Sequence, residues 1–271
     1  FRSSVSYDGE HKALHNVNVK IYEGERIAVL GNNGAGKSTF FLCLNGVLPL
    51  QKGELLLNNY RIKRQKKELG LLRENVGFVF QDPDSQMIAS TVESEVSFGL
   101  MNKNLPLEEV KLRVNQTLNE LDLEKLRKTP PHYLSGGEKK RVSIADILVM
   151  SPKVLLFDEP TSSLDGKNVK VFEDILEEQA LNDVTMLIST HDIDFAFRWA
   201  NRILVFHEGE IIADDVPENI FSQEALLLKA SLRKPAFYQF TEMLCKYRNQ
   251  ELPDLMPKDE KEFEVFLMNK E

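Results

Sequence analysis

The glycine-rich stretch "GNNGAGKST", residues 31–39, constrains the fold of this 271-residue chain more than any other feature. It follows the continuously apolar "RIAVL" and fits the spacing of Gly, four residues, then Gly-Lys-Ser/Thr. Glycines let backbone N–H groups curl around a phosphate, and the positive end of a following helix faces the same anion. We therefore predict a buried strand, a phosphate-binding loop and a helix from about Lys37 to Asn45.

Apolar patterning indicates further strands along the chain. The alternation in "HNVNVKIY" predicts a half-buried antiparallel strand. The apolar runs "GELLLN", "VGFVF", "KVLLFDEP" and "VTMLIST" predict further strands, and "RILVFHEGEIIAD" predicts a hairpin that turns at Glu208 and Gly209. Between about residues 84 and 151 the pattern is helical and charged, and helical patterns also follow the last two apolar runs.

This order of elements predicts an α/β fold. Residues 1–222 are expected to form a phosphate-loop domain with an antiparallel β subdomain and an inserted α-helical subdomain at about 84–151. Residues 223–271 are expected to form a C-terminal helical extension.

Composition excludes several classes of protein. The net charge of −8 argues against a general nucleic-acid binder, because affinity for the phosphate backbone requires an excess of Lys and Arg. Two cysteines make no disulfide framework, which fits a reducing cytosol. No apolar stretch is long enough to cross a bilayer as a helix.

Two acids follow the apolar run "VLLF". Asp158, at the predicted strand end near the phosphate loop, is placed to hold a Mg²⁺ shell. Glu159 is one residue further on and could polarise an attacking water as general base. Burying two adjacent carboxylates without a cation would be costly, so the phosphate loop favours this interpretation over an exposed acidic pair.

Two more polar side chains end apolar runs. Gln81 follows "VGFVF" and could reach a metal ion or a water with its neutral amide. His191, in "ISTHD", could hold a γ-phosphate by a hydrogen bond and respond to its loss. A lone histidine is more often structural, so this interpretation depends on the other motifs.

The phosphate loop, Gln81, "LSGGE", "VLLFDEP", "SSLD" and "STHD" stand in the order found in ATP-binding cassette (ABC) ATPases, and residues 1 to 221 resemble that family. The resemblance implies an ABC-type nucleotide-binding domain that hydrolyses ATP with Mg²⁺. It implies catalytic roles for Glu159, His191 and Gln81. The nucleotide-binding residues that it implies, with Tyr7 stacking on adenine, are Tyr7, Gly31, Asn32, Asn33, Gly34, Ala35, Gly36, Lys37, Ser38 and Thr39. The Mg²⁺ ligands that it implies are Ser38, Gln81 and Asp158.

"LSGGEKKR" resembles the signature loop of that family, in which two subunits pack head to tail. The resemblance implies that Ser135, Gly136, Gly137 and Glu138 face the ATP of a second ATPase subunit, either an identical copy or a paralogue. Asp165 resembles the residue that links the two sites across the dimer. The following cations, residues 139–141, are expected to face solvent, the sheet or neighbouring acids instead of nucleic acid.

The segment "FQDPDSQMIASTVESEVSFG" is similar to energy-coupling factor importers, and "TPPHYLSGGEKKRVSIADILVMSPKVLLFDEPTSSLD" is similar to their cobalt/nickel branch. The resemblance implies a peripheral subunit at the cytoplasmic face of the cell membrane. Its partners would be an integral membrane coupling protein and a substrate-binding membrane protein. The sequence departs from the family pattern at Glu138, where Gln is commoner, and at Asp146, where a small residue is usual.

Alternative functions differ in what the sequence should contain. The nearest is the shared ATPase of a vitamin-importing energy-coupling factor module. A soluble non-transport ABC ATPase that remodels DNA or ribosomes would have a long coiled-coil insert, tandem cassettes or a basic surface. A non-hydrolysing regulatory cassette is disfavoured by intact Lys37, Asp158, Glu159 and His191.

Two surfaces are predicted to meet partners. After Gln81, acids at 82, 84, 93 and 95 surround apolar residues, which predicts an acidic-rimmed groove for an arginine-bearing helix of the membrane partner. In "FYQFTEMLCKY", Phe237, Phe240, Met243, Leu244 and Tyr247 recur at helical spacing. This stripe is expected either to contact the second subunit or to pack on its own cassette, and the pattern does not separate the two.

Overall fold

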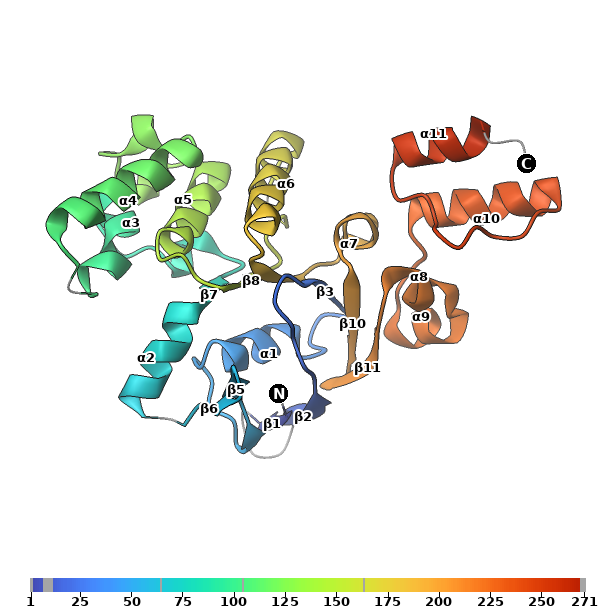
Figure 1. The fold of residues 1–271 in the computed structure, drawn as a ribbon, viewed down its shortest axis with the longest axis horizontal. Helices are drawn as coiled ribbons and strands as arrows, with labels where there is room; N and C mark the ends of the chain where they lie inside the picture. The colour runs from blue at the N-terminus through green and yellow to red at the C-terminus, as the bar shows by residue number, and fades with distance from the viewer. Residues whose placement is uncertain (1, 7–11, 64, 104, 163, 269–271) are drawn as a thin grey trace.

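The structure, a computed structural model, describes residues 2–6, 12–63, 65–103, 105–162 and 164–268 (Figure 1). Its centre is a six-stranded sheet. In spatial order the strands are β11 (Glu210–Asp215), β10 (Arg202–His207), β3 (Arg26–Leu30), β9 (Thr185–Ser189), β8 (Val154–Asp158) and β7 (Val76–Val79). All neighbours are parallel except β10 and β11. The β10–β11 hairpin turns at Glu208 and Gly209, as predicted. Both of these residues have positive φ.

The two faces of the sheet bury different helices. Alternate residues of β3 point in opposite directions, so Ile27 and Val29 belong to one apolar cluster and Ala28 and Leu30 to the other. The first cluster contains α1 (Lys37–Leu44), which follows the phosphate loop. The second contains α6 (Gly166–Leu181) and α7 (Ile193–Trp199). The predicted α/β class is therefore confirmed.

An antiparallel β subdomain covers the face that bears α1. Its three-stranded sheet consists of β1 (Arg2–Ser6), β2 (Lys12–Asn18) and β4 (Lys52–Glu54), and a second pair consists of β5 (Leu56–Leu57) and β6 (Tyr60–Arg61). Helix α2 (Lys66–Asn75) then leads directly into β7. The single strand predicted for "GELLLN" is thus two short strands, and β2 ends before the alternation in its sequence does.

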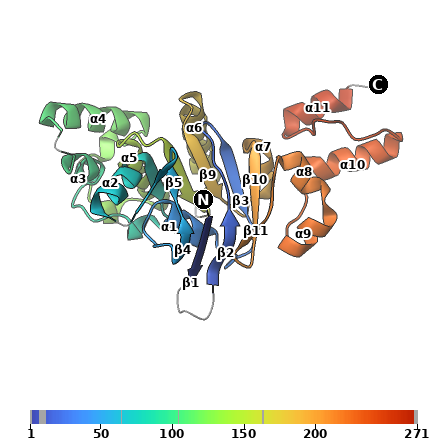
Figure 2. The same ribbon diagram turned by 60° about the horizontal axis from the view of Figure 1, so that its bottom comes forward.

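The inserted helical segment lies between β7 and β8 in sequence and beyond the β7 edge of the sheet (Figures 1 and 2). Its helices are α3 (Val92–Met101), α4 (Leu107–Glu120) and α5 (Gly136–Leu148). A short 3₁₀ turn at Pro83–Ser85 precedes α3, and two more, at Glu124–Leu126 and Pro131–Tyr133, lie between α4 and α5. Buried residues recur at helical spacing, as Val92, Val96 and Leu100 do in α3. No helix in the described ranges combines the length and apolarity needed to cross a membrane.

The last four helices are α8 (Pro217–Ser222), α9 (Glu224–Ala230), α10 (Ala236–Arg248) and α11 (Glu260–Met268). Helix α10 packs on the cassette through Tyr238, whose ring meets Phe197 of α7 edge-on at 5.9 Å between centroids. The carboxylate of Asp194 in α7 accepts hydrogen bonds from the Ala236 N–H and the Arg233 guanidinium. Consequently, the extension is joined to the helix that directly follows His191.

The predicted apolar stripe of α10 does not make this contact. Phe237 and Phe240 instead meet Phe263 of α11, at 5.7 and 6.1 Å between ring centroids. Met243 and Tyr247 remain 68% and 85% exposed. The extension therefore packs on its own cassette through a different face of α10, and the stripe is covered only partly.

Candidate functional site

The phosphate loop lies between β3 and α1. Two of its glycines cannot be replaced, because neighbouring backbone atoms leave no room for a side chain and because their φ angles are positive. Gly31 and Gly36 have φ of +140° and +105°. A Cβ added to Gly31 would lie 2.2 Å from the Phe206 carbonyl oxygen, and one on Gly36 would lie 2.7 Å from the Ala13 carbonyl oxygen. Any side chain at either position would displace backbone, so the loop shape depends on both glycines.

Lys37 opens α1 and turns its ammonium group back into the loop. Its Nζ donates to the carbonyl oxygens of Gly31, at 2.6 Å, and of Asn32, at 3.3 Å. Burial lowers the pKa of Lys37, although the charges of Glu159 and Asp158 oppose this shift. A phosphate in the loop would further stabilise the charged ammonium, so the buried cation suits an anionic ligand.

Asp158 and Glu159 lie at the end of β8, as the sequence predicted. Asp158 is buried, and its Oδ1 accepts a 2.5 Å hydrogen bond from the Ser189 hydroxyl of β9. Glu159 adopts a positive φ of 43°, which is uncommon for a residue with a side chain. Its N–H donates to the carbonyl and hydroxyl oxygens of Ser189, at 3.1 and 3.0 Å, and these bonds hold the turn.

His191 lies next to Glu159. Its Nε2 is 3.1 Å from Glu159 Oε1, yet the geometry is not that of a hydrogen bond, and Oε1 is buried with no hydrogen-bond partner among the described residues. Burial raises the pKa of Glu159, and the nearby His191 and Lys37 oppose that rise. A buried carboxylate oxygen with a free acceptor position and a raised pKa is suited to accept a proton from water.

Gln81 is exposed, two residues beyond the end of β7. The pairing of Val79 with Phe157 brings it to the same edge of the sheet as Asp158. Among the described residues no cluster of three or more His, Cys, Asp or Glu side chains could hold a metal ion. A Mg²⁺ ion here would therefore need hydroxyl, amide and phosphate oxygens beside Asp158, which is the usual habit of Mg²⁺ at phosphate sites.

The signature residues begin α5 with a capping box. The Ser135 hydroxyl accepts from the Glu138 N–H at 3.4 Å, and Glu138 Oε2 accepts from the Ser135 N–H at 2.8 Å. The hydrogen bonds that the Glu138 carboxylate accepts from the N–H and the hydroxyl of Ser135, both at 2.8 Å, lower the pKa of Glu138. The departure from Gln at this position thus has a structural reason, because a carboxylate makes a strong cap at a helix N-terminus.

Asp165 caps α6 and orients a neighbour of the signature loop. Its Oδ1 accepts from the backbone N–H and the side-chain amide of Asn168, both at 2.9 Å. A Cβ on Gly137 would lie 2.4 Å from that amide nitrogen, so the Asn168 side chain packs directly on the signature glycine. The structure thereby brings Asp165 and the signature loop together.

The three cations after the signature loop have separate partners. Lys139 pairs with Asp84 at 2.7 Å, and Arg141 donates to Asn168 at 2.8 Å. Lys140 is buried and donates to the carbonyl oxygens of Phe80, at 2.8 Å, and Gln81, at 3.2 Å. Burial lowers its pKa to about 8, against the charges of Asp158 and Asp82.

The role of Lys140 was not identified from the sequence. It lies three and four residues before the buried Ser143 and Ile144, so helical spacing could have placed it on the inner face of α5. Tyr7, predicted to stack on adenine, lies outside the described residues, and its role stays a prediction.

The fold and this loop define a nucleotide-binding protein of the P-loop class. The sequence profile of ABC transporters matches residues 14–162. The chain belongs to the ABC transporter family and is an ATPase of that family.

Three similar proteins show how far the likeness extends. The energy-coupling factor transporter ATP-binding protein EcfA of Methanothermobacter thermautotrophicus is 44% identical over 86% of this chain and 75% of its own length. The structure of CbiO1 from Clostridium perfringens, part of the ABC transporter complex CbiONQ, covers 89% of this chain and 96% of its own, with 39% identity and a TM-score of 0.74. A dimeric ATP-binding cassette in a post-hydrolysis state, with ADP and Pi bound, covers 79% and 95%, with 30% identity and a TM-score of 0.72.

Proposed function

We propose that this chain is the ATP-hydrolysing subunit of an energy-coupling factor importer. ATP hydrolysis is supported above all by the geometry of Glu159. Its buried Oε1 lies beside His191 and near Lys37 and has no hydrogen-bond partner among the described residues. Relatives that are 43–44% identical to this chain are named energy-coupling factor transporter ATP-binding proteins, and these names support the transporter part. The discriminating test is ATP-dependent solute uptake by vesicles that contain the chain together with its membrane partners, compared with the same vesicles carrying a Glu159→Gln chain.

In the proposed mechanism the loop 31–39 cradles the phosphates of ATP and Lys37 neutralises their charge. Ser38, Asp158 and Gln81 would hold Mg²⁺, which supplies further neutralisation of phosphate charge when bound. Glu159 accepts the proton of the attacking water, and His191 holds the γ-phosphate while keeping the base in position. The exposed hydroxyl of Ser38 and the buried carboxylate of Asp158 fit these roles.

We further propose that each site is completed by a second ATPase subunit, either a copy or a paralogue. The signature residues from Ser135 to Glu138 would face that subunit's ATP, with the N-terminus of α5 directed at its γ-phosphate. The dimeric cassette with ADP and Pi supports this arrangement. The chain would then lie peripherally at the cytoplasmic face of the membrane, against a coupling protein and a substrate-binding protein.

The substrate that we propose is cobalt or nickel, on the resemblance of residues 129–165 to that branch and the likeness to CbiO1. Import of a vitamin by a shared energy-coupling module is the second candidate. The uptake assay separates them when radioactive Co²⁺ or Ni²⁺ and labelled vitamins are offered in parallel.

The predicted acidic rim of the docking groove needs correction. Asp84 is paired with Lys139 and Glu93 with Arg127, both at 2.7 Å. Glu95 is only 2% exposed, and it accepts from the N–H groups of residues 88 and 89. Asp84 and Glu93 are occupied by cations that are distant in sequence, and Glu95 is occupied by nearby backbone N–H groups, so these three carboxylates are not free to recognise an incoming arginine.

The apolar part of that surface is available instead. Ile88 is 71% exposed, and Phe98 and Met101 on α3 are 51% and 59% exposed. Large apolar side chains exposed near one another mark interaction surfaces. We therefore propose that the membrane partner's helix rests on these residues.

The double variant Ile88→Asp, Phe98→Asp should lose co-purification with the membrane partners and solute uptake, because it places charges in an apolar contact. Its ATP binding should be unchanged, since neither residue belongs to the phosphate site. Leu112→Asp, on the exposed part of α4, is the matched control and should retain both. Normal uptake by the double variant would show that the partner docks elsewhere.

We propose residues 1–222 as the ATPase unit and residues 223–271 as an extension whose exposed stripe meets the second subunit. Phe240→Glu combined with Met243→Glu should weaken subunit association in sedimentation by at least about tenfold, since covering the exposed parts of two large apolar side chains is worth about 2 kcal/mol. Leu228→Glu, on α9 and even more exposed, is the control. Unchanged association would indicate that the stripe serves only the contact with α11.

A further inference from the structure

The segment "RIKRQKK", residues 61–67, is the most basic stretch of an otherwise acidic chain, with five Lys or Arg among seven residues. It runs from the end of β6 into the first turn of α2. Arg61, Lys63, Lys66 and Lys67 are exposed, and Arg64 lies outside the described residues. None of the nucleotide-binding motifs uses this segment.

Its charges have little compensation within the chain. Of these four cations, only Arg61 has a carboxylate within 4.0 Å in the described structure, Glu54 at 3.6 Å. The neighbouring Glu68 is buried and accepts from the Tyr60 hydroxyl and the Lys63 N–H. Lys66 and Lys67 lie at the N-terminus of α2, where the helix dipole disfavours cations. The segment is therefore arranged to gain from an external anion.

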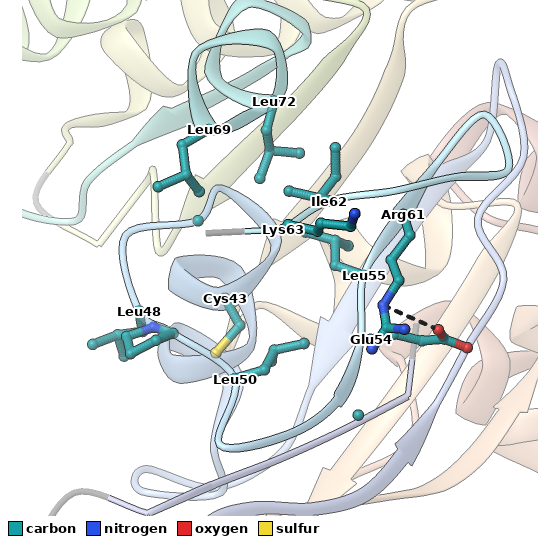
Figure 3. A pocket seen from close by; sticks show the side chains of 13 residues that line it. Cys43, Leu48, Leu50, Glu54, Leu55, Arg61, Ile62, Lys63, Leu69 and Leu72 are labelled. Atoms are coloured by element: carbon teal, nitrogen blue, oxygen red, sulfur yellow. Dashed lines mark ion pairs between the residues drawn. The ribbon is translucent and has the colours of Figure 1, made fainter. Parts of the chain in front are cut away.

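An apolar cavity of about 420 Å³ opens beside this segment (Figure 3). It lies between the end of α1, the short strands and α2. Five leucines line it, together with Ile62: Leu48, Leu50, Leu55, Leu69 and Leu72. Arg61, Lys63 and Glu54 belong to the same lining. Glu54 pairs with Arg61, so Lys63 is the cation at the margin of this leucine-rich interior that has no carboxylate within 4.0 Å among the described residues.

The cavity also has a defined place in the molecule. Helix α2 leads into β7, which ends just before Gln81 and the surface proposed for the membrane partner. Figures 1 and 2 both show α2 beyond the β7 edge of the sheet, on the same side as α3 and α5. A ligand in the cavity would therefore lie on the side of the molecule that the proposed function turns toward the membrane.

We propose that this cavity and the basic segment bind an anionic phospholipid of the membrane, with part of an acyl chain among the leucines and the phosphate against Lys63, Lys66 and Lys67. The inference rests on the proposed membrane-peripheral function. Charge complementarity favours it, because anionic lipids attract clustered Lys and Arg at a membrane surface. The occupied site would orient the ATPase relative to the bilayer independently of its protein partner.

The test measures co-flotation of the purified chain with vesicles of phosphatidylcholine, with or without about one third phosphatidylglycerol. Each basic residue near such a surface contributes about fivefold to binding, so Lys63→Glu with Lys67→Glu should weaken it about 25-fold or more. Lys229→Glu with Lys246→Glu, exposed on α9 and α10, makes the same change in net charge and should bind like the natural chain. Equal loss in both pairs, or no binding to anionic vesicles at all, would overturn the proposal.

A second arm identifies which part of the lipid is bound. Soluble dioctanoyl-phosphatidylglycerol should bind in calorimetry, and Leu69→Trp, which fills the cavity, should weaken it about tenfold. Displacement of the lipid by an equal concentration of inorganic phosphate would overturn the role of the acyl chain. Binding of the basic segment to the purified membrane protein alone, without lipid, would replace the proposal by a protein contact. ATP hydrolysis by each variant is measured in parallel, so failure of lipid binding is distinguishable from failure of the ATPase function.

Discussion

Replacing Glu159 by Gln is expected to lower the rate of ATP turnover on the order of a hundredfold or more, with ATP binding retained. Gln has the shape of Glu but cannot accept the proton of water at neutral pH. The backbone bonds from the Glu159 N–H to Ser189 do not involve the side chain, so the turn after β8 should persist. Single-turnover hydrolysis and nucleotide binding, measured on the same preparation, check this result.

Glu177→Gln, an exposed residue of α6, makes the same chemical change away from the site and should hydrolyse ATP normally. The pH profile adds an independent readout. Because burial raises the pKa of Glu159, the natural rate should begin to fall at a higher pH than an ordinary Glu would give as the solution is acidified. If Glu159→Gln hydrolysed ATP at the full rate, or if its rate fell at the same acidic pH as that of the natural chain, Glu159 would not be the general base.

Ser135→Arg is expected to abolish the ATP-driven association of two subunits. In the Glu159→Gln background, Mg²⁺ and ATP should drive a stable dimer, because in the proposed composite site the trapped nucleotide would be contacted from both sides. An arginine at position 135 would occupy the space of the partner's γ-phosphate. Light scattering with and without ATP measures the association of these variants. In a separate measurement, the hydrolysis rate of the natural chain should rise more steeply than linearly with its concentration.

Ser135→Ala is the matched control, because Ser135 also caps α5. Both variants lose the capping hydroxyl, at a cost of ~1 kcal/mol of stability, but only arginine adds the obstruction. Dimer formation by Ser135→Ala and not by Ser135→Arg would therefore assign the effect to the interface. An isolated monomer that hydrolyses ATP fully at high dilution would contradict the composite site.

Features set by local chemistry were predictable from the sequence. The helix predicted from about Lys37 to Asn45 is observed as Lys37–Leu44, because the glycine loop and Gly46 limit it at both ends. The hairpin at Glu208 and Gly209 followed from turn chemistry, and the buried strands followed from their apolar runs. The acids at the end of β8 were predictable for the same reason, since a strand end fixes where the next side chains lie.

Features set by distant partners were not predictable. The sequence after Gln81 carries four acids and no Lys or Arg until Lys103, yet Glu93 pairs with a residue 34 positions away and Asp84 with one 55 positions away. The stripe of α10 was identified correctly as apolar, but which face of the helix would meet α7 depended on the bonds to Asp194. Periodicity describes the surface of an element and does not identify what covers it.

Lys140 has a consequence for how two bound nucleotides act on one another. It lies in the helix that Ser135 caps, and its ammonium group donates to the carbonyl oxygens of Phe80 and Gln81. In the proposed pair of subunits, the start of that helix would meet the partner's ATP while Gln81 would meet the chain's own. A shift of α5 caused by one nucleotide would then move Gln81 at the other. ATP hydrolysis at the two sites is therefore expected to be cooperative. This cooperativity is expected to depend on the buried ammonium group of Lys140.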